Sequence, residues 1–180
     1  MTIQSNSPSI LLAVNPTDPG ASHITVPMAQ NSRVGTFYIY ALANSGSGTY
    51  TATFPGVSPV TGTAQFTNSG FVIIPTGSTT VDHTTQTSTQ LEIFAALLDQ
   101  NGAPINFTTQ PLAGNQQLHV SVRSNAAAAT VSPTVTVMPG TDHALAPVTI
   151  VSAGTATISV SQPIGFSTPN SFTSVVLNIQ

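Results

Sequence analysis

The sequence predicts an all-β protein built of two tandem β-sandwich modules. Residues 48–54, "GTYTATF", and residues 154–161, "GTATISVS", alternate apolar side chains with Thr or Ser, which is the pattern of a strand with one buried face. Clusters of Gly, Pro, Asn and Asp such as "NPTDPG", "DQNGAP" and "VMPGTD" separate the strand-like segments and favour tight turns. Short strands joined by such turns are typical of a β-sandwich.

The remaining strands are expected in short segments along the whole chain. They lie at residues 10–14, 23–28, 36–42, 63–66, 71–74, 91–98, 117–123, 131–137, 147–151 and 173–179. One stretch, residues 89–102, also fits a helix, because Leu91, Phe94 and Leu98 recur at helical spacing. We favour a strand that is buried on both faces and ends at the turn signal "DQNGAP".

An internal repeat indicates the domain organisation. Ser5-Asn6 and Ser124-Asn125 each precede an apolar segment. Aligning these pairs brings "SGSGTYTATFPG" onto "SAGTATISVSQPIG" and "TGTAQFTNSGFVII" onto "NSFTSVVLNI". Residues 76–88 are rich in Ser and Thr, which is typical of a linker. We therefore expect one module at residues 1–75, a linker at 76–88 and a second module at 89–180.

The two copies of the repeat are unequal at their beginnings. About 35 residues of the second module precede Ser124, enough for two strands and a connection, whereas only "MTIQ" precedes Ser5. The N-terminal module is therefore expected to lack its first strand and most of its second. A sandwich of this kind exposes an unpaired sheet edge and an open core.

Composition excludes several classes of function. Only 4% of the residues are charged, and Arg33 and Arg123 are the only Lys or Arg residues, so the clustered cations that bind nucleic acid are missing. No apolar run approaches the roughly 20 residues of a membrane-spanning helix. The start of the chain lacks the basic and apolar regions of a secretion signal. Without cysteine there is neither a disulfide scaffold nor thiolate chemistry.

Two acid–histidine pairs are the main candidates for site chemistry. Asp82-His83 and Asp142-His143 each place a carboxylate beside an imidazole, which fits a metal ligand pair or a general base. Neither pair has the repeated spacing of a metal motif, and the other two histidines lie on expected strands, so we expect structural or surface histidines. No Gly-x-Ser-x-Gly motif occurs. We expect no catalytic residue, cofactor or metal, and no enzyme activity.

The order of these motifs resembles that of a known family. The passages "SPSILLAVNPTDPGASHITVPMAQNSRVGTFYIYALANSGSGTYTATFPGVSPVTGTAQFTNSGFVI" and "LAGNQQLHVSVRSN", followed by "VSAGTATISVSQPIGFSTPNSFTSVVLNI", resemble the tandem Ig-like repeats of long bacterial surface proteins of the acidobacterial type. The resemblance implies that the two β-sandwich modules are Ig-like. It also implies a secreted or cell-surface location, a structural or adhesive role, and no catalytic residues.

An incomplete Ig-like module suggests assembly by strand addition, in which a neighbouring copy supplies the missing strand. Such a contact joins two different surfaces, so repeated contacts that do not close give a filament of one protein. The expected donor segments are residues 173–180 and 87–98, and the second of these could also act within the same chain. The expected donor side chains are Thr173, Val175, Leu177, Ile179, Leu91 and Ile93. The expected acceptor side chains are Ile3, Ile10, Leu12 and Val14.

The segment "TFYIYAL" supports an alternative function. Tyr38 and Tyr40 fall on one face of the expected strand, where they either cover the sheet or form an exposed aromatic pair that binds a surface glycan. The alternatives to self-assembly are therefore an adhesin or carbohydrate-binding module, or a spacer module cut from a longer tandem-repeat surface protein.

Overall fold

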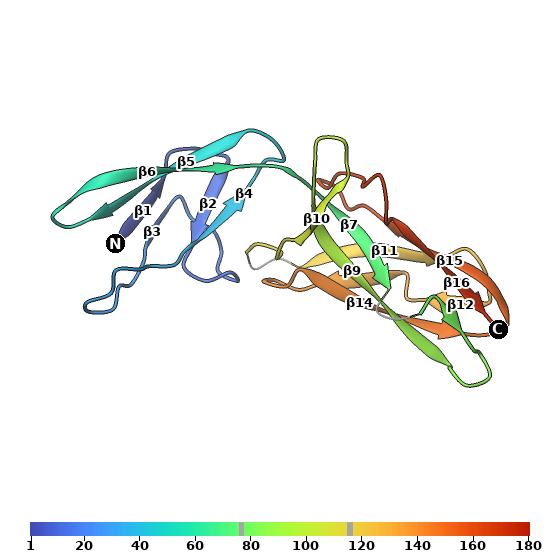
Figure 1. Ribbon diagram of the computed structural model, residues 1–180. Helices are drawn as coiled ribbons and strands as arrows, with labels where there is room; N and C mark the ends of the chain where they lie inside the picture. Colours follow the sequence, from blue (N-terminus) through green and yellow to red (C-terminus); the bar gives the residue numbers. More distant parts are fainter. Residues whose placement is uncertain (76–77, 115–116) are drawn as a thin grey trace. The chain divides into compact units, whose positions relative to one another are not determined.

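The computed structural model describes residues 1–75, 78–114 and 117–180. Within these ranges the chain forms strands joined by turns and bends and contains no helix, which confirms the all-β class (Figure 1). A helix that could cross a membrane is accordingly not found in the described part of the chain. The chain divides into two compact units. Unit 1 comprises Met1–Thr67 with Ala113–Gln116, and unit 2 comprises Asn68–Leu112 with Gln117–Gln180.

Unit 1 is a small sandwich of two unequal sheets. Its strands are β1 (Thr2–Ser5), β2 (Ile10–Ala13), β3 (His23–Thr25), β4 (Tyr38–Ala41), β5 (Ser47–Phe54) and β6 (Val57–Gln65). One antiparallel sheet has the order β3-β1-β5-β6, and β2 pairs with β4 in the other. The buried core consists of Ile3, Leu12 and Val26, with Tyr50 and Ala52 of the alternating segment "GTYTATF" packed against it.

Unit 2 is a larger sandwich of two five-stranded sheets. Its strands are β7 (Asn68–Pro75), β8 (Thr80–Val81), β9 (Ser88–Leu98), β10 (Pro104–Thr109), β11 (Leu118–Ser124), β12 (Ala129–Val131), β13 (Thr134–Val137), β14 (His143–Ile150), β15 (Gly154–Ser161) and β16 (Ser174–Ile179). One sheet has the order β13-β11-β15-β16-β8. In the other, β9 pairs with β7, β10 and β14, and β14 also pairs with β12. Both units are consistent with Ig-like β-sandwich modules.

Twenty buried hydrophobic residues form the core of unit 2, because both of its sheets are five strands wide. Alternation places every second residue of β14 inside, from Ala144 to Ile150. β9 is buried on both faces. Leu91 and Ile93 enter the main core, while Leu98 joins a second buried cluster with Val72 on the opposite side. The expectation of a strand rather than a helix in this segment is confirmed.

The structure shows the internal repeat strand for strand. The sheet order β3-β1-β5-β6 of unit 1 recurs as β13-β11-β15-β16 in unit 2, and the β2–β4 pair recurs as β12–β14. The turn after the first strand of each copy is also the same. The Ser5 hydroxyl donates to the Ser7 carbonyl at 2.6 Å, and the Ser124 hydroxyl donates to the Ala126 carbonyl at 2.9 Å. Unit 1 therefore corresponds to β11–β16, and its described residues hold no counterpart of β7–β10.

The unit boundary differs from the expected one. Residues 68–75 were expected in the first module, but they form β7 and pair along their whole length with β9, so unit 2 begins at Asn68. The expected linker at 76–88 also contains structure: β8 pairs with the C-terminal part of β16, and Val81 is buried. Residues 76 and 77 of that linker lie outside the described residues. The boundary between the units differs from the expected one because an apolar strand joins whichever sheet offers a partner, and the partner of residues 68–75 is β9.

Candidate functional site

The candidate site of unit 1 is the edge of β4 that has no partner strand. In unit 2, β14 lies between β12 on one side and β9 on the other. In the described part of unit 1, β4 pairs with β2 and with no second strand. β14 is eight residues long and β4 is four, because the first half of β14 is paired through β9 alone. Among the described residues of unit 1, no strand lies beside β4 at the place where β9 lies beside β14.

The repeat fixes which positions of unit 1 correspond to positions of β14. Leu12 lies seven residues after Ser5 and pairs with Ile39, whereas Val131 lies seven residues after Ser124 and pairs with Val148. The equivalences that follow are Ile39 with Val148, Phe37 with Ala146 and Gly35 with Ala144. In unit 2 these three positions of β14 pair with Thr89, Leu91 and Ile93 of β9. In the part of unit 1 that the structure describes, the same backbone edge has no strand beside it.

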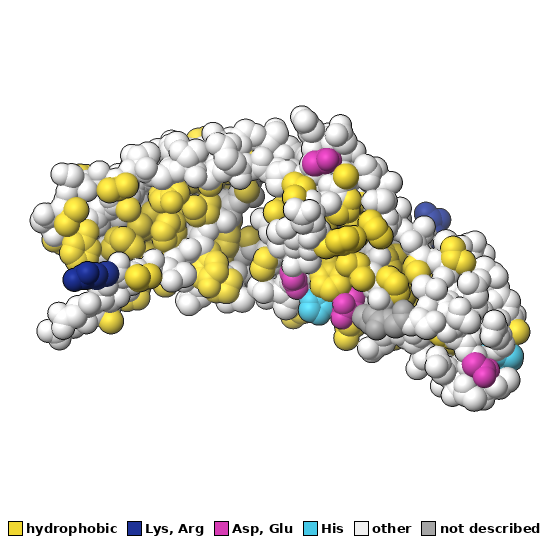
Figure 2. Space-filling model, in the orientation of Figure 1, with side chains coloured by type: hydrophobic (Ala, Val, Ile, Leu, Met, Phe, Trp, Pro, Cys, Tyr) yellow, Lys and Arg dark blue, Asp and Glu magenta, His cyan; other side chains and the backbone are white. Residues whose placement is uncertain are grey.

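An open groove of about 380 Å³ lies next to this edge. Its lining is predominantly apolar and includes one charged side chain, that of Arg33. The residues that line it are Met1, Ile3, Met28, Arg33, Val34, Gly35, Phe37, Tyr50, Ala52, Val60 and Gly62. Figure 2 shows hydrophobic side chains of unit 1 gathered on the face turned to the viewer. An apolar surface of this kind, beside an unpaired strand edge, is suited to accept a strand with apolar side chains.

Two close approaches shape the groove. The ring of Tyr50 lies directly over Gly62, so a Cβ atom at position 62 would come within 2.3 Å of it. The sulfur of Met28 lies close to Gly35, and a Cβ atom at position 35 would come within 2.6 Å of it. Phe37 packs edge-on against Tyr50 with ring centroids 5.4 Å apart. In unit 2 the counterparts of β5 and β6, which are β15 and β16, are contacted by β7.

The structure brings only part of the expected acceptor set to this groove. Ile3 lines it, whereas Leu12 and Ile10 are fully buried inside unit 1 and Val14 is partly buried just after β2. The lining residues that sequence reasoning missed come from β5, β6 and the segments around β3 and β4. Tyr50 and Ala52 had a visible signal, because both lie on the apolar face of the alternating segment "GTYTATF".

Both expected donor segments belong to unit 2. β16 lies between β15 and β8, with Leu177 and Ile179 buried and Thr173 and Val175 partly buried. Leu91 and Ile93 lie on β9 between β7 and β14, and both are buried. The structure contradicts the alternative in which residues 87–98 complete the first module within the same chain. β9 pairs with β7 and β14 within unit 2, so it does not cover the second edge of β4.

Tyr38 and Tyr40 do not form an exposed pair. Tyr40 is 7% exposed, and its hydroxyl lies 2.9–3.1 Å from the carbonyl oxygens of Asn15, Pro16 and Asp18, to any one of which it can donate. Burial raises the pKa of Tyr40. Tyr38, at 39% exposure, is the accessible member of the two. Tyr40 therefore fixes the loop after β2, and a stacked pair for a glycan is not present.

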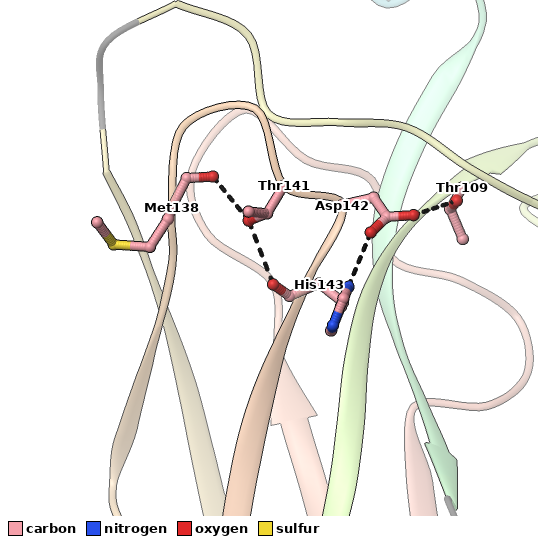
Figure 3. Close-up of polar contacts among 5 residues, drawn as sticks. All are labelled: Thr109, Met138, Thr141, Asp142 and His143. Carbon is pink, nitrogen blue, oxygen red and sulfur yellow. Dashed lines mark hydrogen bonds and ion pairs between the residues drawn. The ribbon is translucent and has the colours of Figure 1, made fainter. Parts of the chain in front are cut away.

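The Asp142-His143 pair takes part in hydrogen bonds that connect two strands of unit 2 (Figure 3). The Asp142 carboxylate accepts hydrogen bonds from the His143 ring at 2.8 Å and from the Thr109 hydroxyl at 2.5 Å, which ties the start of β14 to the end of β10. The hydrogen bonds from His143 and Thr109 lower the pKa of Asp142. The imidazole also packs on the ring of Phe94 at 5.1 Å. Hydrogen bonds from the side chain and backbone of Thr84 lower the pKa of Asp82.

His83 and His119 also form hydrogen bonds within unit 2. The His83 ring is hydrogen-bonded to the Gln180 carbonyl at 2.6 Å, and the His119 ring to the Thr136 hydroxyl at 3.1 Å. Among the described residues, no group of three His, Cys, Asp or Glu side chains is arranged to hold a metal ion.

Comparisons with known proteins identify similar solved structures but no family. No protein-family model matches the sequence, and no curated protein matches it. Among solved structures, the chain is similar to domains 4 and 5 of the S-layer protein SbsC, at 15% identity and a TM-score of 0.42, over 75% of this chain and 65% of that one. The aligned region thus spans less than two thirds of that structure.

Two further SbsC structures are similar to this chain. The one of domains 4–9 has 17% identity and a TM-score of 0.34, over 99% of this chain and 21% of that one. The one of domains 5–6 has 16% identity and a TM-score of 0.29, over 98% and 78%. Because all three TM-scores lie below 0.5, no function is inferred from these similarities. The function is inferred from the geometry of the chain itself.

Proposed function

We propose that this chain is a non-catalytic structural protein of an extracellular or cell-surface assembly, and that unit 1 joins the assembly by strand complementation. The observation that carries the proposal is the unpaired edge of β4 beside an apolar groove, at the position that β9 occupies in unit 2. An incoming strand gains backbone hydrogen bonds along the edge and buries apolar side chains in the groove. Each fully buried Leu or Ile contributes about 1.5–3 kcal/mol.

The geometry favours head-to-tail joining of copies. The acceptor edge belongs to unit 1, and the strand of matching type belongs to unit 2, so donor and acceptor surfaces differ. Contacts between different surfaces propagate as open chains unless their rotation closes a ring. The low charge of the protein, with a formal net charge of −3, gives little repulsion between copies. We therefore expect short filaments at high concentration.

The test compares two substitutions on one strand. Val60 lines the groove and is 64% exposed, whereas Val57, also on β6, is 61% exposed and lies outside the groove lining. Because both side chains are already accessible, Val60→Asp and Val57→Asp have similar small effects on the folding of a single chain. Only the first places a carboxylate where an apolar strand would lie.

Light scattering across a concentration series, with electron microscopy of the concentrated samples, provides the readout. We expect the unmodified chain and the Val57→Asp variant to associate with increasing concentration and the Val60→Asp variant to remain monomeric. A chain that stays monomeric at every concentration would contradict self-assembly. Equal association of the two variants would place the contact outside the groove.

A further inference from the structure

Resting on the strand-acceptor role proposed above, we infer that the occupant of the β4 edge is the β9 segment, Ser88–Leu98, of a second copy of this chain. The strand runs antiparallel to β4, and its side chains at positions 89, 91 and 93 lie opposite Ile39, Phe37 and Gly35. Unit 2 supplies the template, because Thr89, Leu91 and Ile93 pair with the equivalent positions of β14. β4 would thereby lengthen toward the N-terminus to the full extent of β14.

Unit 1 distinguishes between the two donor segments that the sequence suggested. The place of β16 is already taken in unit 1 by β6: Tyr50 pairs with Gly62 as Ile158 pairs with Val175. The place of β9 is the vacant one. A second β16 strand would have no matching position, whereas a β9 strand meets the counterpart of β14, which is one of its neighbours in unit 2.

The side-chain pattern of β9 selects one register on this edge. In the proposed register the apolar Leu91 and Ile93 face the groove, and Glu92 faces away from it. A slip of one residue reverses every side chain and turns the Glu92 carboxylate toward Phe37 and Tyr50. Burial of an unpaired carboxylate is strongly unfavourable, so the slipped register binds at least about tenfold more weakly.

The number of strands limits assembly from this chain alone. The described residues of each chain contain two equivalent strand edges, one on β4 and one on β14, but only one β9 strand that can pair with them. Exchange between copies therefore completes unit 1 of one molecule by opening unit 2 of another. We expect association of the pure chain to be weak and a free β9 peptide to bind the groove more tightly, in competition with that association.

Disulfide trapping tests the position and the register, since the chain has no native cysteine. Thr36 is exposed and corresponds to Leu145, which pairs with Glu92 in unit 2. The full chain with Thr36→Cys is mixed under mild oxidation with a peptide of residues 87–98 that carries Glu92→Cys. Directly opposed residues on antiparallel strands are close enough for a disulfide. The matched control is the same peptide with Phe94→Cys, which places the thiol two residues away on the same face.

A second measurement needs no substitution. All three tyrosines, Tyr38, Tyr40 and Tyr50, lie in unit 1, and the chain has no tryptophan, so tyrosine circular dichroism in the near ultraviolet reports on unit 1 alone. The unmodified peptide is titrated into the unmodified chain, and thermal unfolding of unit 1 is followed through this signal. Binding to the folded unit raises its unfolding temperature as the peptide concentration rises.

The expected result is a one-to-one disulfide that forms at least about tenfold faster with the Glu92→Cys peptide than with the control, together with a higher unfolding temperature of unit 1. Equal rates for the two peptides, or no change in unfolding, would overturn the inference. Failure of the proposed function is distinguishable from failure of the inference. A chain that never associates would overturn self-assembly and the second copy as occupant, and capture of the peptide in register would then leave only the strand-acceptor role of the β4 edge. Association that persists while the peptide fails to bind would support self-assembly and overturn β9 as the occupant.

Discussion

Replacing Ile93 by Ala tests whether β9 stabilises unit 2 or unit 1. Ile93 is fully buried on β9, pairs with Ile73 and Ala144, and belongs to the twenty-residue core of unit 2. Truncating a buried Ile costs the transfer free energy of the lost carbons and leaves a cavity, which together destabilise by about 2–5 kcal/mol. Because Ile93 has no exposed surface and lies between two paired strands, we expect a loss of about 3–4 kcal/mol.

In thermal unfolding this loss lowers the transition temperature of unit 2 by roughly 10–25 °C for a domain of about 100 residues. Circular dichroism in the far ultraviolet reports both units, whereas the tyrosine signal reports unit 1. We expect Ile93→Ala to move the far-ultraviolet transition and leave the tyrosine transition in place. Val176→Ala is the matched control, because Val176 is 47% exposed on β16 and its truncation has little effect.

The refuting result is a tyrosine transition that moves by the same amount as the far-ultraviolet one. That outcome would mean that residues 87–98 complete unit 1 within the same chain. Unit 1 would then have no vacant strand position, and both the strand-acceptor proposal and the inference drawn from it would fail together.

Two further predictions concern polar contacts. Asp142→Asn removes the carboxylate that accepts from His143 and Thr109, and we expect a loss of about 1–2 kcal/mol in unit 2 at neutral pH, measured by urea unfolding. Because the pKa of Asp142 is lowered in the folded protein, its contribution is present above the ordinary Asp pKa near 4 and is lost as pH falls through the lower folded value. The variant should therefore lose less stability than the unmodified chain on acidification below about pH 4, and an identical acid limb would contradict this. Tyr40→Phe removes the hydroxyl that donates to the loop after β2 and should lower the stability of unit 1 by about 1 kcal/mol, measured by urea unfolding and the remaining tyrosine signal. Tyr38→Phe, at an exposed position, is the control and should have no measurable effect.

Local patterns in the sequence were sufficient for the strands that have one buried face. "GTYTATF" and "GTATISVS" became β5 and β15, because alternation directly encodes which side chains enter the core. Local signals found only the end of β6, through the strand expected at residues 63–66, because the residues of β6 are mostly exposed. They missed β10, which has a register shift and no regular apolar face. β8 is two residues long and depends on pairing with β16, so no local pattern could reveal it.

The boundary between the units shows the limit of sequence alignment. The apolar run "FVII" in residues 71–74 was assigned to the first module by similarity to the apolar segment near the C-terminus. In the structure that segment, β16, corresponds to the weakly apolar β6, and "FVII" lies on β7 beside β9. Apolar runs are interchangeable in a local comparison, and only pairing distinguishes them.

For this chain, the sequence alone determined the all-β class and the two related copies, because alternation, turn residues and repeat spacing are local properties. Tertiary structure decided which strand edge lies open in the described part of unit 1 and which side chains line the groove beside it. Whether an edge such as that of β4 is paired, and whether Tyr40 or Ile3 faces a loop, a core or an open groove, depends on strands distant in the sequence. Their hydrogen bonds and burial exist only once the sheets have assembled.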